Sequence, residues 1–587
     1  MCGIIGINEN NKSLLNKAGL KFNYRGPDAT AFFNDDFVTL GHHRLSIIDL
    51  DPRSTQPMSD SDDKIKVVFN GEIYNFQAIK DLLKVKYDFR TTSDTEVIIY
   101  AYKEWGIKMV ERLQGMFAIA LYDSELKQIF LIRDHRGIKP LYYYAKDGYF
   151  VFASELKGVT SVLTDRSIKL KVSQKALDLY FCLGYIPAPY SLYEGVFKVS
   201  RSSYVVYDLA TKVISQEYLY QGSTTPVASL ENYFDLIEKK ILDHLVADVP
   251  VGVFFSGGTD SSLIAAVLHQ HGINLETFSI KLNYKTEDYK YFSQISSYLN
   301  LKSHVYDFNV TEFEGVYEEV MSKLDEPTYD NSIFPTYFVS KKAAQKVKVV
   351  LSGEGGDEFF LGYPRSAVLY HLNKYRDYHI SLLDRLFFIL PSFKAKNRLF
   401  EKLFVLFRQP FSFYLMSVSP TRDLAKIKQW RVFKQECVKR KIIPVEIDQE
   451  FYLEGDLLRK IDLATSYVSI EGRVPLLDID IIKNSENFDR EKLKGGVLKA
   501  LLKGMLAKYI PNDMVYRNKS GFGLDMVSFF QQSVILRSDF NRAMEFLKTK
   551  DINLPSLPDS AELALRKYPH LCFAYISLYR SLVNNEL

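Results

Sequence analysis

Residues 1–7, Met1-Cys2-Gly3-Ile4-Ile5-Gly6-Ile7, decide the fold of the N-terminal part of this chain. An apolar run of this length without a charge predicts a buried strand. Loss of Met1 would leave Cys2 with both a thiol and a free α-amine. Such an amine, with a pKa near ~8, can take the thiol proton through a water and produce a nucleophilic thiolate. We therefore predict that Cys2 is a nucleophile, and the alternative is a small buried residue at the start of a strand.

The composition describes an ordinary globular protein of more than one domain. The chain has 587 residues, and its 75 basic and 71 acidic residues leave a formal charge of only +4, which gives no support to a nucleic-acid partner. Four cysteines, Cys2, Cys182, Cys437 and Cys572, lie too far apart for a metal or disulfide pattern. The chain shows neither a signal peptide nor an apolar run of membrane-spanning length. We predict a cytoplasmic protein without a membrane span, and helix core for the apolar runs at 382–390 and 400–414.

The first two hundred residues show short strands separated by turn signals. The sequence predicts turns at 25–28, 70–71 and 136–137, and a helix after Ser93-Asp94-Thr95-Glu96, which has the pattern of an N-cap with a capping box. The predicted strands are 2–7, 38–42, 64–69, 128–133 and 149–153. This alternation indicates two packed β-sheets flanked by helices.

Three further positions in this region have side chains or backbone groups that could bind a substrate or stabilise a reaction intermediate. Arg44 could hold a carboxylate in a bidentate fork. The Asn70 amide beside the Gly71 N–H gives two donors that could stabilise an oxyanion, and Asp94 could bind an ammonium group. Taken singly, each has a structural alternative: a surface ion pair, a hairpin turn and a helix cap. In this order after Cys2, they predict one site.

The second half of the chain alternates strands with helices. A β-branched and aromatic run at 251–255 is followed by the loop 256–262, SGGTDSS, and then by a helical pattern. Strand, glycine-rich loop and helix form a phosphate cradle, because backbone N–H groups and the helix N-terminus face the anion. The loop lacks the Gly-Lys-Ser/Thr of the Walker type, and an ordinary Gly/Ser turn is the alternative. Further strands at 277–282 and 348–351 predict a parallel sheet.

A second glycine-rich loop, SGEGGDE at 352–358, follows the last of these strands. Ligands of open α/β sheets bind beyond the carboxyl ends of the strands, so both loops can face one site. Asp260 and Asp357 could then share a Mg²⁺ ion that bridges nucleotide phosphates.

The motifs in this order resemble two known domains. Residues 1–4, 25–28, 44, 70–75, 94, 115–118 and 133–134 are similar to the glutaminase domain of class II glutamine amidotransferases. Residues 256–262, 325–336, 471–478, 499–511 and 517–522 resemble the pyrophosphatase-loop ATP domain of the asparagine synthetases. The resemblance implies an α/β protein with an N-terminal four-layer αββα nucleophile-hydrolase domain at 1–205. A C-terminal α/β parallel-sheet ATP-pyrophosphatase domain with a helical extension would occupy 225–587.

The resemblance also implies a glutaminase site. Cys2 would attack the side-chain amide of glutamine, and Asn70 with the Gly71 N–H would stabilise the oxyanion. Arg44 would hold the α-carboxylate, and Glu72 and Asp94 the α-amine. The whole implied glutamine-binding set is Arg44, Leu45, Ile47, Asn70, Glu72 and Asp94.

In the second domain the resemblance implies that ATP activates a carboxylate as an acyl-adenylate. Lys499 would stabilise charge on the α-phosphate, with Lys494 as the competing candidate, and Glu354 would act near the adenylate. Asp260 and Asp357 would hold Mg²⁺. The implied ATP-binding set is Phe255, Ser256, Gly257, Gly258, Thr259, Asp260, Ser261, Ser262, Ile280, Ser352 and Gly353.

The expected activity is that of a glutamine-hydrolysing asparagine synthetase, a carbon–nitrogen ligase. Glutamine, aspartate and ATP would be its small-molecule partners, ammonia would pass through an internal channel, and a homodimer is possible. Gly472, Leu476, Lys281 and Lys503 depart from the family pattern, so the acceptor stays open. The alternatives are amidation of another carboxylate, such as a sugar acid or natural-product precursor, and a non-catalytic scaffold. We expect residues 365–460 to be structural.

Overall fold

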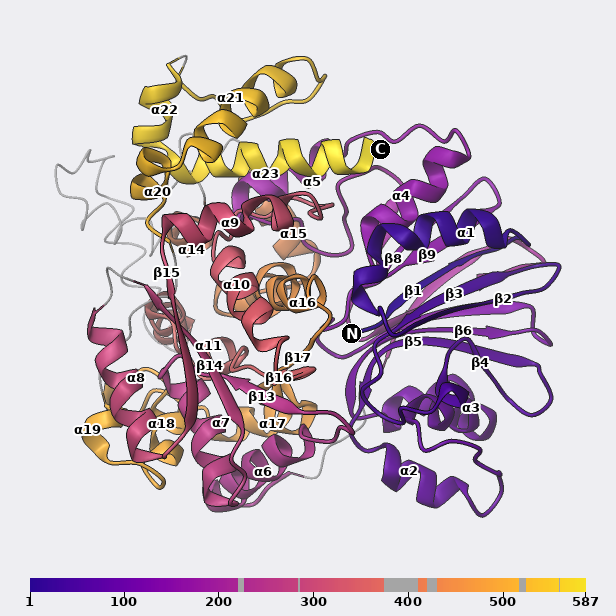
Figure 1. Cartoon of the computed structure of the whole chain (residues 1–587), viewed down its shortest axis with the longest axis horizontal. Coiled ribbons are helices and arrows are strands. Elements are labelled where there is room, and N and C mark those ends of the chain that lie inside the picture. The colour runs from indigo at the N-terminus through magenta and orange to yellow at the C-terminus, as the bar shows by residue number, and fades with distance from the viewer. Residues whose placement is uncertain are drawn as a thin grey trace, which may run out of the picture.

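The structure, a computed structural model, describes residues 1–219, 226–282, 286–373, 410–419, 430–516, 524–558 and 560–586. The chain forms two domains that lie side by side, and the N-terminus lies at the seam between them (Figure 1). The predicted helical run at 382–390, the part of 400–414 before Pro410 and the motif at 517–522 lie outside the described residues.

The N-terminal domain contains two antiparallel sheets. The first has the strand order β10-β8-β9-β1-β3-β2 and the second the order β12-β11-β7-β6-β5-β4. The strands of the first sheet are β1 (Gly3–Ile7), β2 (Ala29–Asn34), β3 (Thr39–Arg44), β8 (Tyr142–Lys146), β9 (Tyr149–Ala153) and β10 (Val196–Lys198). Those of the second are β4 (Met58–Ser59), β5 (Ile65–Ile73), β6 (Gly115–Asp123), β7 (Gln128–Arg133), β11 (Ser203–Asp208) and β12 (Ile214–Tyr218). The five strands that we predict are all present.

The sheets pack face to face and helices cover their outer faces, so the predicted four-layer αββα fold is confirmed (Figure 1). Ile4 and Val68 lie in the core between the sheets, whereas their neighbours Ile5 and Val67 pack under the outer helices. Side chains alternate along a strand, and apolar residues on both faces therefore bury both. The outer helices are α1 (Lys12–Gly19) and α4 (Leu156–Asp165) on one face and α2 (Phe76–Leu83) and α3 (Asp94–Trp105) on the other.

The predicted turn at Asn70-Gly71 is wrong. Both residues lie within β5, where Asn70 pairs with Ala118 and Gly71 with Phe117 of β6. The Asn-Gly dipeptide favours a hairpin turn only when the strands end there, and the apolar pattern of β5 continues to Ile73. The strand thus carries Asn70 into the interior instead of exposing it at a turn.

The predicted capping box before α3 is also absent from the described contacts. The Ser93 side chain does cap the helix by accepting the Thr95 N–H at 3.1 Å. The Glu96 carboxylate instead accepts the backbone N–H groups of Arg90 and Thr91. The Ser93 N–H, which a capping box would bond to Glu96, donates to Thr91 Oγ1 at 3.3 Å.

The C-terminal domain is built on a parallel sheet with the order β15-β14-β13-β16-β17, as predicted. Val350 of β16 faces α10 (Ile333–Ala343), and the next residue, Leu351, faces α7 (Thr259–Gln270), so helices cover both faces of the sheet. The strands are β13 (Val251–Phe254), β14 (Glu276–Leu282), β15 (Lys302–Phe308), β16 (Val349–Leu351) and β17 (Glu471–Arg473).

Helices extend this domain along one side (Figure 1). The long last helix, α23 (Pro569–Glu586), contacts α4 of the N-terminal domain and α21 (Val534–Lys548). The remaining helices are α5 (Gln174–Leu183), α6 (Leu230–Asp243), α8 (Thr286–Tyr298), α9 (Val310–Met321), α11 (Gly356–Phe359), α14 (Pro410–Val418), α15 (Trp430–Lys439), the π-helix η5 (Asp448–Leu458), α16 (Arg459–Ser466), α17 (Ile479–Ser485), α18 (Ala500–Leu506), α19 (Asn512–Val515), α20 (Met526–Gln532) and α22 (Ala561–Lys567).

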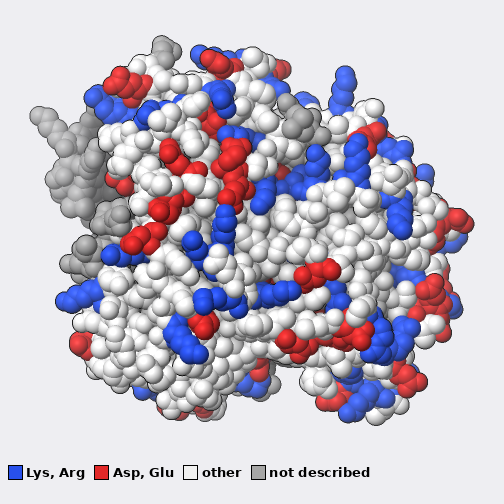
Figure 2. Space-filling model, viewed as in Figure 1, with Lys and Arg blue, Asp and Glu red and all other residues white. Residues whose placement is uncertain are grey.

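Charges of both signs are interspersed over the face shown in Figure 2, on both domains. Within the described ranges, none of the helices has the length and apolarity needed to cross a membrane.

Candidate active sites

Cys2 lies at the seam between the domains, directly before β1. Its backbone nitrogen donates to Asn70 Oδ1 at 3.0 Å, and its backbone oxygen accepts from Arg25 Nε at 3.0 Å. The thiol lies 3.8 Å from the carbonyl oxygen of Leu45. Burial raises the pKa of the Cys2 thiol, so the thiolate needs a nearby base or donor to form at neutral pH.

Met1 precedes Cys2 and is buried, with its amino group 3.8 Å from a carboxylate oxygen of Glu471. Burial lowers the pKa of the Met1 amine to about 6. Cleavage of Met1 would place the new α-amine on the Cys2 nitrogen, which already faces Asn70. An α-amine at that nitrogen would lie on the same residue as the thiol and could take its proton.

Asn70 and Gly71 present donors beside Cys2. Asn70 is fully buried, and its Nδ2 has no hydrogen-bond partner among the described atoms. Gly71 has a φ of 155°, and a Cβ there would lie 2.0 Å from the Met116 carbonyl oxygen, so only glycine fits. Phe117, opposite Gly71, exchanges its backbone hydrogen bonds with Asp134, so the Gly71 N–H faces away from β6.

Arg44 ends β3 and is held by the loop that follows. Its guanidinium donates to the carbonyl oxygens of Asp51, at 2.9 Å, and of Asp49. Leu45 and Ile47 in the same loop are buried against Val349 of the C-terminal domain. These contacts fix the arginine at the end of the strand instead of leaving it as a surface ion pair.

Glu72 and Asp94 form a buried pair of carboxyl groups in the same pocket. Burial, followed by the charge of Asp94, raises the pKa of Glu72, while Arg473 at 2.8 Å opposes this shift. Burial also raises the pKa of Asp94 to about 6, although the Ile73 N–H donates to it at 3.1 Å. Two carboxyl groups in these conditions favour a bound cation. A hollow of about 540 Å³ opens nearby, lined by Ile48, Tyr74, Thr92 and residues 242–248, among others.

The second candidate site lies at the carboxyl ends of β13 and β16. The loop after β13 is closed by its own hydroxyls, because the Ser256 N–H donates to Ser261 Oγ and the Gly258 N–H to Ser256 Oγ, both at 3.2 Å. Ser261 and the buried Ser262 begin α7, and Ser262 Oγ has no hydrogen-bond partner within the described part of the chain. This loop and helix start have the form of an anion cradle.

The two glycine-rich loops touch each other closely. A Cβ on Gly353 would lie 2.8 Å from the Asp260 Cβ, and one on Gly356 would lie 2.4 Å from Asp260 Oδ1. Glycine at these places lets the second loop approach Asp260. Ser352 is buried, its hydroxyl donates to Glu354, and Ile280 lies partly exposed on β14.

Lys499 reaches both loops. Its ammonium group pairs with Asp260 and, at 2.8 Å, with Asp357. Burial opposes its charge, but the two carboxylates raise its pKa above the ordinary value. Lys499 has a φ of 56° at the N-cap of α18, and only 5% of its surface is exposed. Lys494 is exposed instead, so the geometry places Lys499, and not Lys494, with the two aspartates.

The arrangement of Asp260, Asp357 and Lys499 shows whether this site could hold a Mg²⁺ ion. Asp260 and Asp357 come from different loops and already share one cation, the Lys499 ammonium. Among the described residues no group of three His, Cys, Asp or Glu side chains forms a metal cage. Mg²⁺ is commonly held by one or two carboxylates with the remaining positions on phosphates and water, so the pair fits a nucleotide-bound ion.

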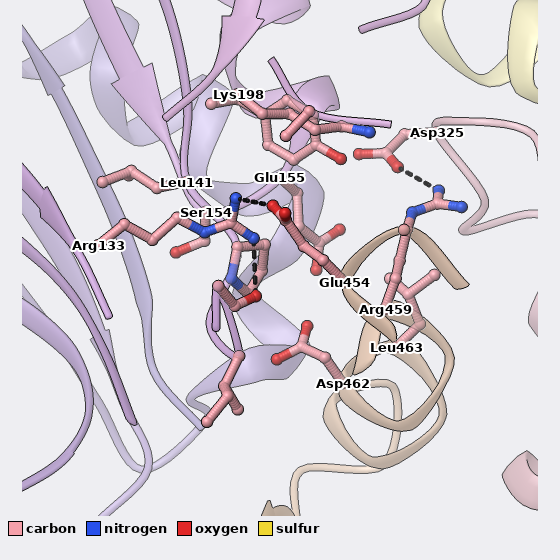
Figure 3. Close-up of a pocket in the computed structure, with 16 residues that line it drawn as sticks. Arg133, Leu141, Ser154, Glu155, Lys198, Asp325, Glu454, Arg459, Asp462 and Leu463 are labelled. Carbon is pink, nitrogen blue, oxygen red and sulfur yellow. Dashed lines mark hydrogen bonds and ion pairs between the residues drawn. The ribbon is translucent and has the colours of Figure 1, made fainter. Parts of the chain in front are cut away.

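The domain interface contains a charged pocket as well as apolar contacts. Figure 3 shows Arg133 directed at Glu454 and Arg459 directed at Asp325, with N–O distances of 2.6 and 3.9 Å, around a cavity of about 40 Å³. A polar cavity of that size can hold ordered water. This charged cavity is distinct from the apolar cluster of Leu45, Ile47 and Val349, which packs against Cys2 and contains residues of both domains.

Arg473, Glu471 and Asp248 were not among the residues that the sequence predicts for a site. Arg473 and Glu471 stand in the 471–478 motif, but nothing local shows that they reach the other domain. The one usable signal is a Glu-x-Arg pair in a strand, because buried charges in a strand need partners.

Comparisons with known proteins agree with this layout. Residues 1–219 match a family model described as glutamine amidotransferase domain, and residues 233–543 match one described as asparagine synthase. The chain is 29% identical over 561 residues to asparagine synthetase 1 (glutamine-hydrolyzing) of Bacillus subtilis, which covers 89% of this chain and 87% of that protein. It is 32% identical over 389 residues to asparagine synthetase B of Escherichia coli, covering 62% of this chain and 65% of that protein.

Proposed function

Since the chain belongs to the asparagine synthase family, we propose that it is a glutamine-dependent asparagine synthetase that acts on aspartate. It would hydrolyse glutamine at Cys2, activate aspartate with ATP and join the ammonia to the activated carboxylate. The observation that carries the proposal is the buried Asn70 Nδ2, which has no hydrogen-bond partner among the described residues and belongs to the side chain that binds the Cys2 nitrogen. A buried donor without a partner requires an explanation, and a catalytic role beside a nucleophile supplies one.

In the first half-reaction Cys2 attacks the glutamine side-chain amide. The oxygen of the tetrahedral intermediate would accept from Asn70 Nδ2 and the Gly71 N–H. The Cys2 α-amine, free after loss of Met1, would pass the thiol proton to the leaving ammonia as the C–N bond breaks and a Cys2 thioester forms. Water would then attack the thioester, which releases glutamate and restores the Cys2 thiol. Arg44 holds the substrate carboxylate, and Glu72 with Asp94 holds its ammonium group.

In the second half-reaction the aspartate side-chain carboxylate attacks the α-phosphorus of ATP and pyrophosphate leaves. The loop 256–262 and the start of α7 would bind phosphate oxygens. Lys499 would neutralise charge that builds on the α-phosphate, and Glu354 would orient the adenylate or accept a proton from ammonia. Ammonia would attack the acyl carbon of the adenylate, the bond from that carbon to the phosphate oxygen would break, and asparagine and AMP would leave. Mg²⁺, held by Asp260 and Asp357, would neutralise phosphate charge when bound.

An apolar path supports transfer of ammonia inside the protein. Met116, opposite Glu72 in the sheet, lies in one buried cluster with Val474 and Leu477 of the other domain. Leu477 contacts Gly355, where a Cβ would lie 2.2 Å from its Cδ2, directly after Glu354. Apolar contacts favour neutral ammonia over the ammonium ion.

The acceptor is tested by assaying asparagine and AMP together, with ATP, magnesium, aspartate and either glutamine or ammonium. Asparagine with AMP in step from both nitrogen sources is the expected result. Glutamate release without asparagine or AMP would reject aspartate and point to another carboxylate, such as a sugar acid or natural-product precursor. Cys2→Ala is expected to lose only the glutamine-driven synthesis, and loss of the ammonia-driven reaction as well would contradict the two-site scheme. A cytoplasmic location and a homodimer stay predictions.

A further inference from the structure

Arg473 contacts both candidate sites. It is fully buried at the end of β17. Its backbone oxygen accepts the N–H of Ser352, at the start of the second glycine-rich loop, at 2.8 Å. Its guanidinium extends into the N-terminal domain, where Nη2 lies 2.8 Å from Glu72 Oε2. One residue of the ATP-binding domain is therefore bonded to a carboxylate of the glutamine pocket.

The guanidinium is fixed by its own domain. Nε donates to Glu471 at 2.9 Å, and Nη1 donates to the carbonyl oxygens of His244 and Val246 at 2.8 and 2.7 Å. These bonds use Nε and Nη1 of the planar guanidinium, and Nη2 is the atom that faces Glu72. The position of Glu72 is thus set from the other domain.

The segment that receives Arg473 also holds the opposite end of the glutamine pocket. The Asp248 N–H donates to the Ile47 carbonyl at 2.9 Å, and the Asp248 carboxylate accepts the Asp49 N–H at 2.7 Å. Asp49 supplies a carbonyl oxygen to Arg44. The ammonium side and the carboxylate side of the pocket are both anchored on residues 244–248.

Glu72 needs a cation because it lies beside Asp94 in a buried place. Without Arg473 the pKa of Glu72 would rise further, because Arg473 supplies the charge that opposes burial and the neighbouring Asp94. Arg473 opposes this rise in the pKa of Glu72 and, through its 2.8 Å contact with Oε2, fixes the orientation of the carboxyl group beside Asp94. The two carboxyl groups, which lie within hydrogen-bonding reach of each other, are thereby held together at one place where a ligand ammonium could bind.

We infer that Arg473 is a positioning residue for glutamine: it holds the Glu72 carboxyl group in place, so the ATP-binding domain completes the ammonium subsite of the glutaminase. This rests on the proposed function, because Glu72 is taken to bind the glutamine ammonium.

Arg473→Lys is the first test, since lysine keeps the charge but loses the fork. We expect the KM for glutamine to rise about tenfold or more, the loss of one charge-assisted hydrogen bond, with a smaller change in kcat. Ammonia-driven synthesis is expected to stay near the wild-type rate. Arg201→Lys is the matched control, because Arg201 also pairs across the domains, with Glu450, away from the glutamine pocket.

Arg473→Met tests the charge itself. Removal of the cation is expected to shift the acid limb of kcat/KM for glutamine to higher pH, because Glu72 then protonates more readily. A purely structural role would lower the rate without moving this limb. If Arg473→Met does not fold, as judged from ammonia-driven synthesis, a double-mutant cycle of Arg473→Lys with Glu72→Gln replaces it. KM effects that multiply in the double variant would overturn the inference.

The outcomes separate the two proposals. A wild-type enzyme that hydrolyses no glutamine would overturn the proposed function together with this inference. A wild-type glutaminase whose KM and pH profile are unchanged in Arg473→Lys and Arg473→Met would overturn only the role of Arg473.

Discussion

Replacement of Asn70 by alanine tests the oxyanion geometry most directly. In the structure Asn70 Oδ1 accepts the Cys2 N–H at 3.0 Å, while Nδ2 is buried without a described partner. Alanine removes both functions: the donor for the intermediate and the acceptor that orients the nucleophile. Binding of glutamine through Arg44 and Asp94 stays intact, so the loss should fall on kcat and leave KM nearly unchanged.

The magnitude follows from these two lost contacts. Removal of one oxyanion donor costs a factor of about 10²–10³ in kcat, or about 2.7–4 kcal/mol. Loss of the hydrogen bond that orients Cys2 adds about 0.5–1.5 kcal/mol, up to about a further tenfold. We therefore expect kcat for glutamine hydrolysis to fall by a factor of about 10²–10⁴.

The assay is glutamate release under saturating glutamine, with ammonia-driven synthesis as the internal control for folding. Asn70→Asp is the companion variant, because it retains an oxygen that can accept from Cys2 but has no N–H donor. It should be as slow as Asn70→Ala if the donor dominates. A folded Asn70→Ala enzyme that hydrolyses glutamine within about tenfold of the wild-type rate would refute the assignment, since a lost donor costs at least about 10².

Three further predictions address the other groups. Lys499→Ala should abolish ATP-dependent AMP release and spare glutaminase activity, and the opposite ranking with Lys494→Ala would show that the wrong lysine was assigned. Gly362→Ala should have the same effect as Lys499→Ala, because its Cβ would lie 1.9 Å from Asp357 Oδ1 and 2.3 Å from Lys499 Cε; wild-type AMP release from this variant would contradict the close packing. Since burial raises the pKa of Asp94 to about 6, kcat/KM for glutamine should decrease as the pH falls below about 6, and a flat profile from pH 5 to 7 would exclude an ionised Asp94 from binding.

Local patterns were enough for the strands and loops that hold the chemistry. The apolar run after Cys2 and the loop 256–262 after a β-branched strand each specify their own conformation, because neighbouring residues decide it. Asn70-Gly71 shows a conformation that neighbouring residues do not decide. The dipeptide alone favours a turn, but pairing with β6 keeps it in a strand, and that partner is distant in sequence.

Lys499 shows a second limit. Its sequence neighbourhood is that of a helix-face lysine, and a φ of 56° places it before the helix instead, where its side chain reaches Asp260 and Asp357. No periodicity predicts a left-handed residue at that place, because it is stabilised by ion pairs with two loops that are far away in the chain.

The domain interface, like Asn70-Gly71 and Lys499, depends on partners that are distant in sequence. Its buried ion pairs, Arg473 with Glu72 and Arg25 with Asp462, add little net stability, since desolvation offsets most of their attraction. What they provide is geometry: a buried charge left without its partner is costly, so the domains can dock in few ways. That constraint fixes the glutamine pocket, which lies at the interface, relative to the loop that carries Glu354. Under the proposed function, transfer of ammonia between the two sites would need this fixed relation, and an interface held only by apolar contacts would not impose it.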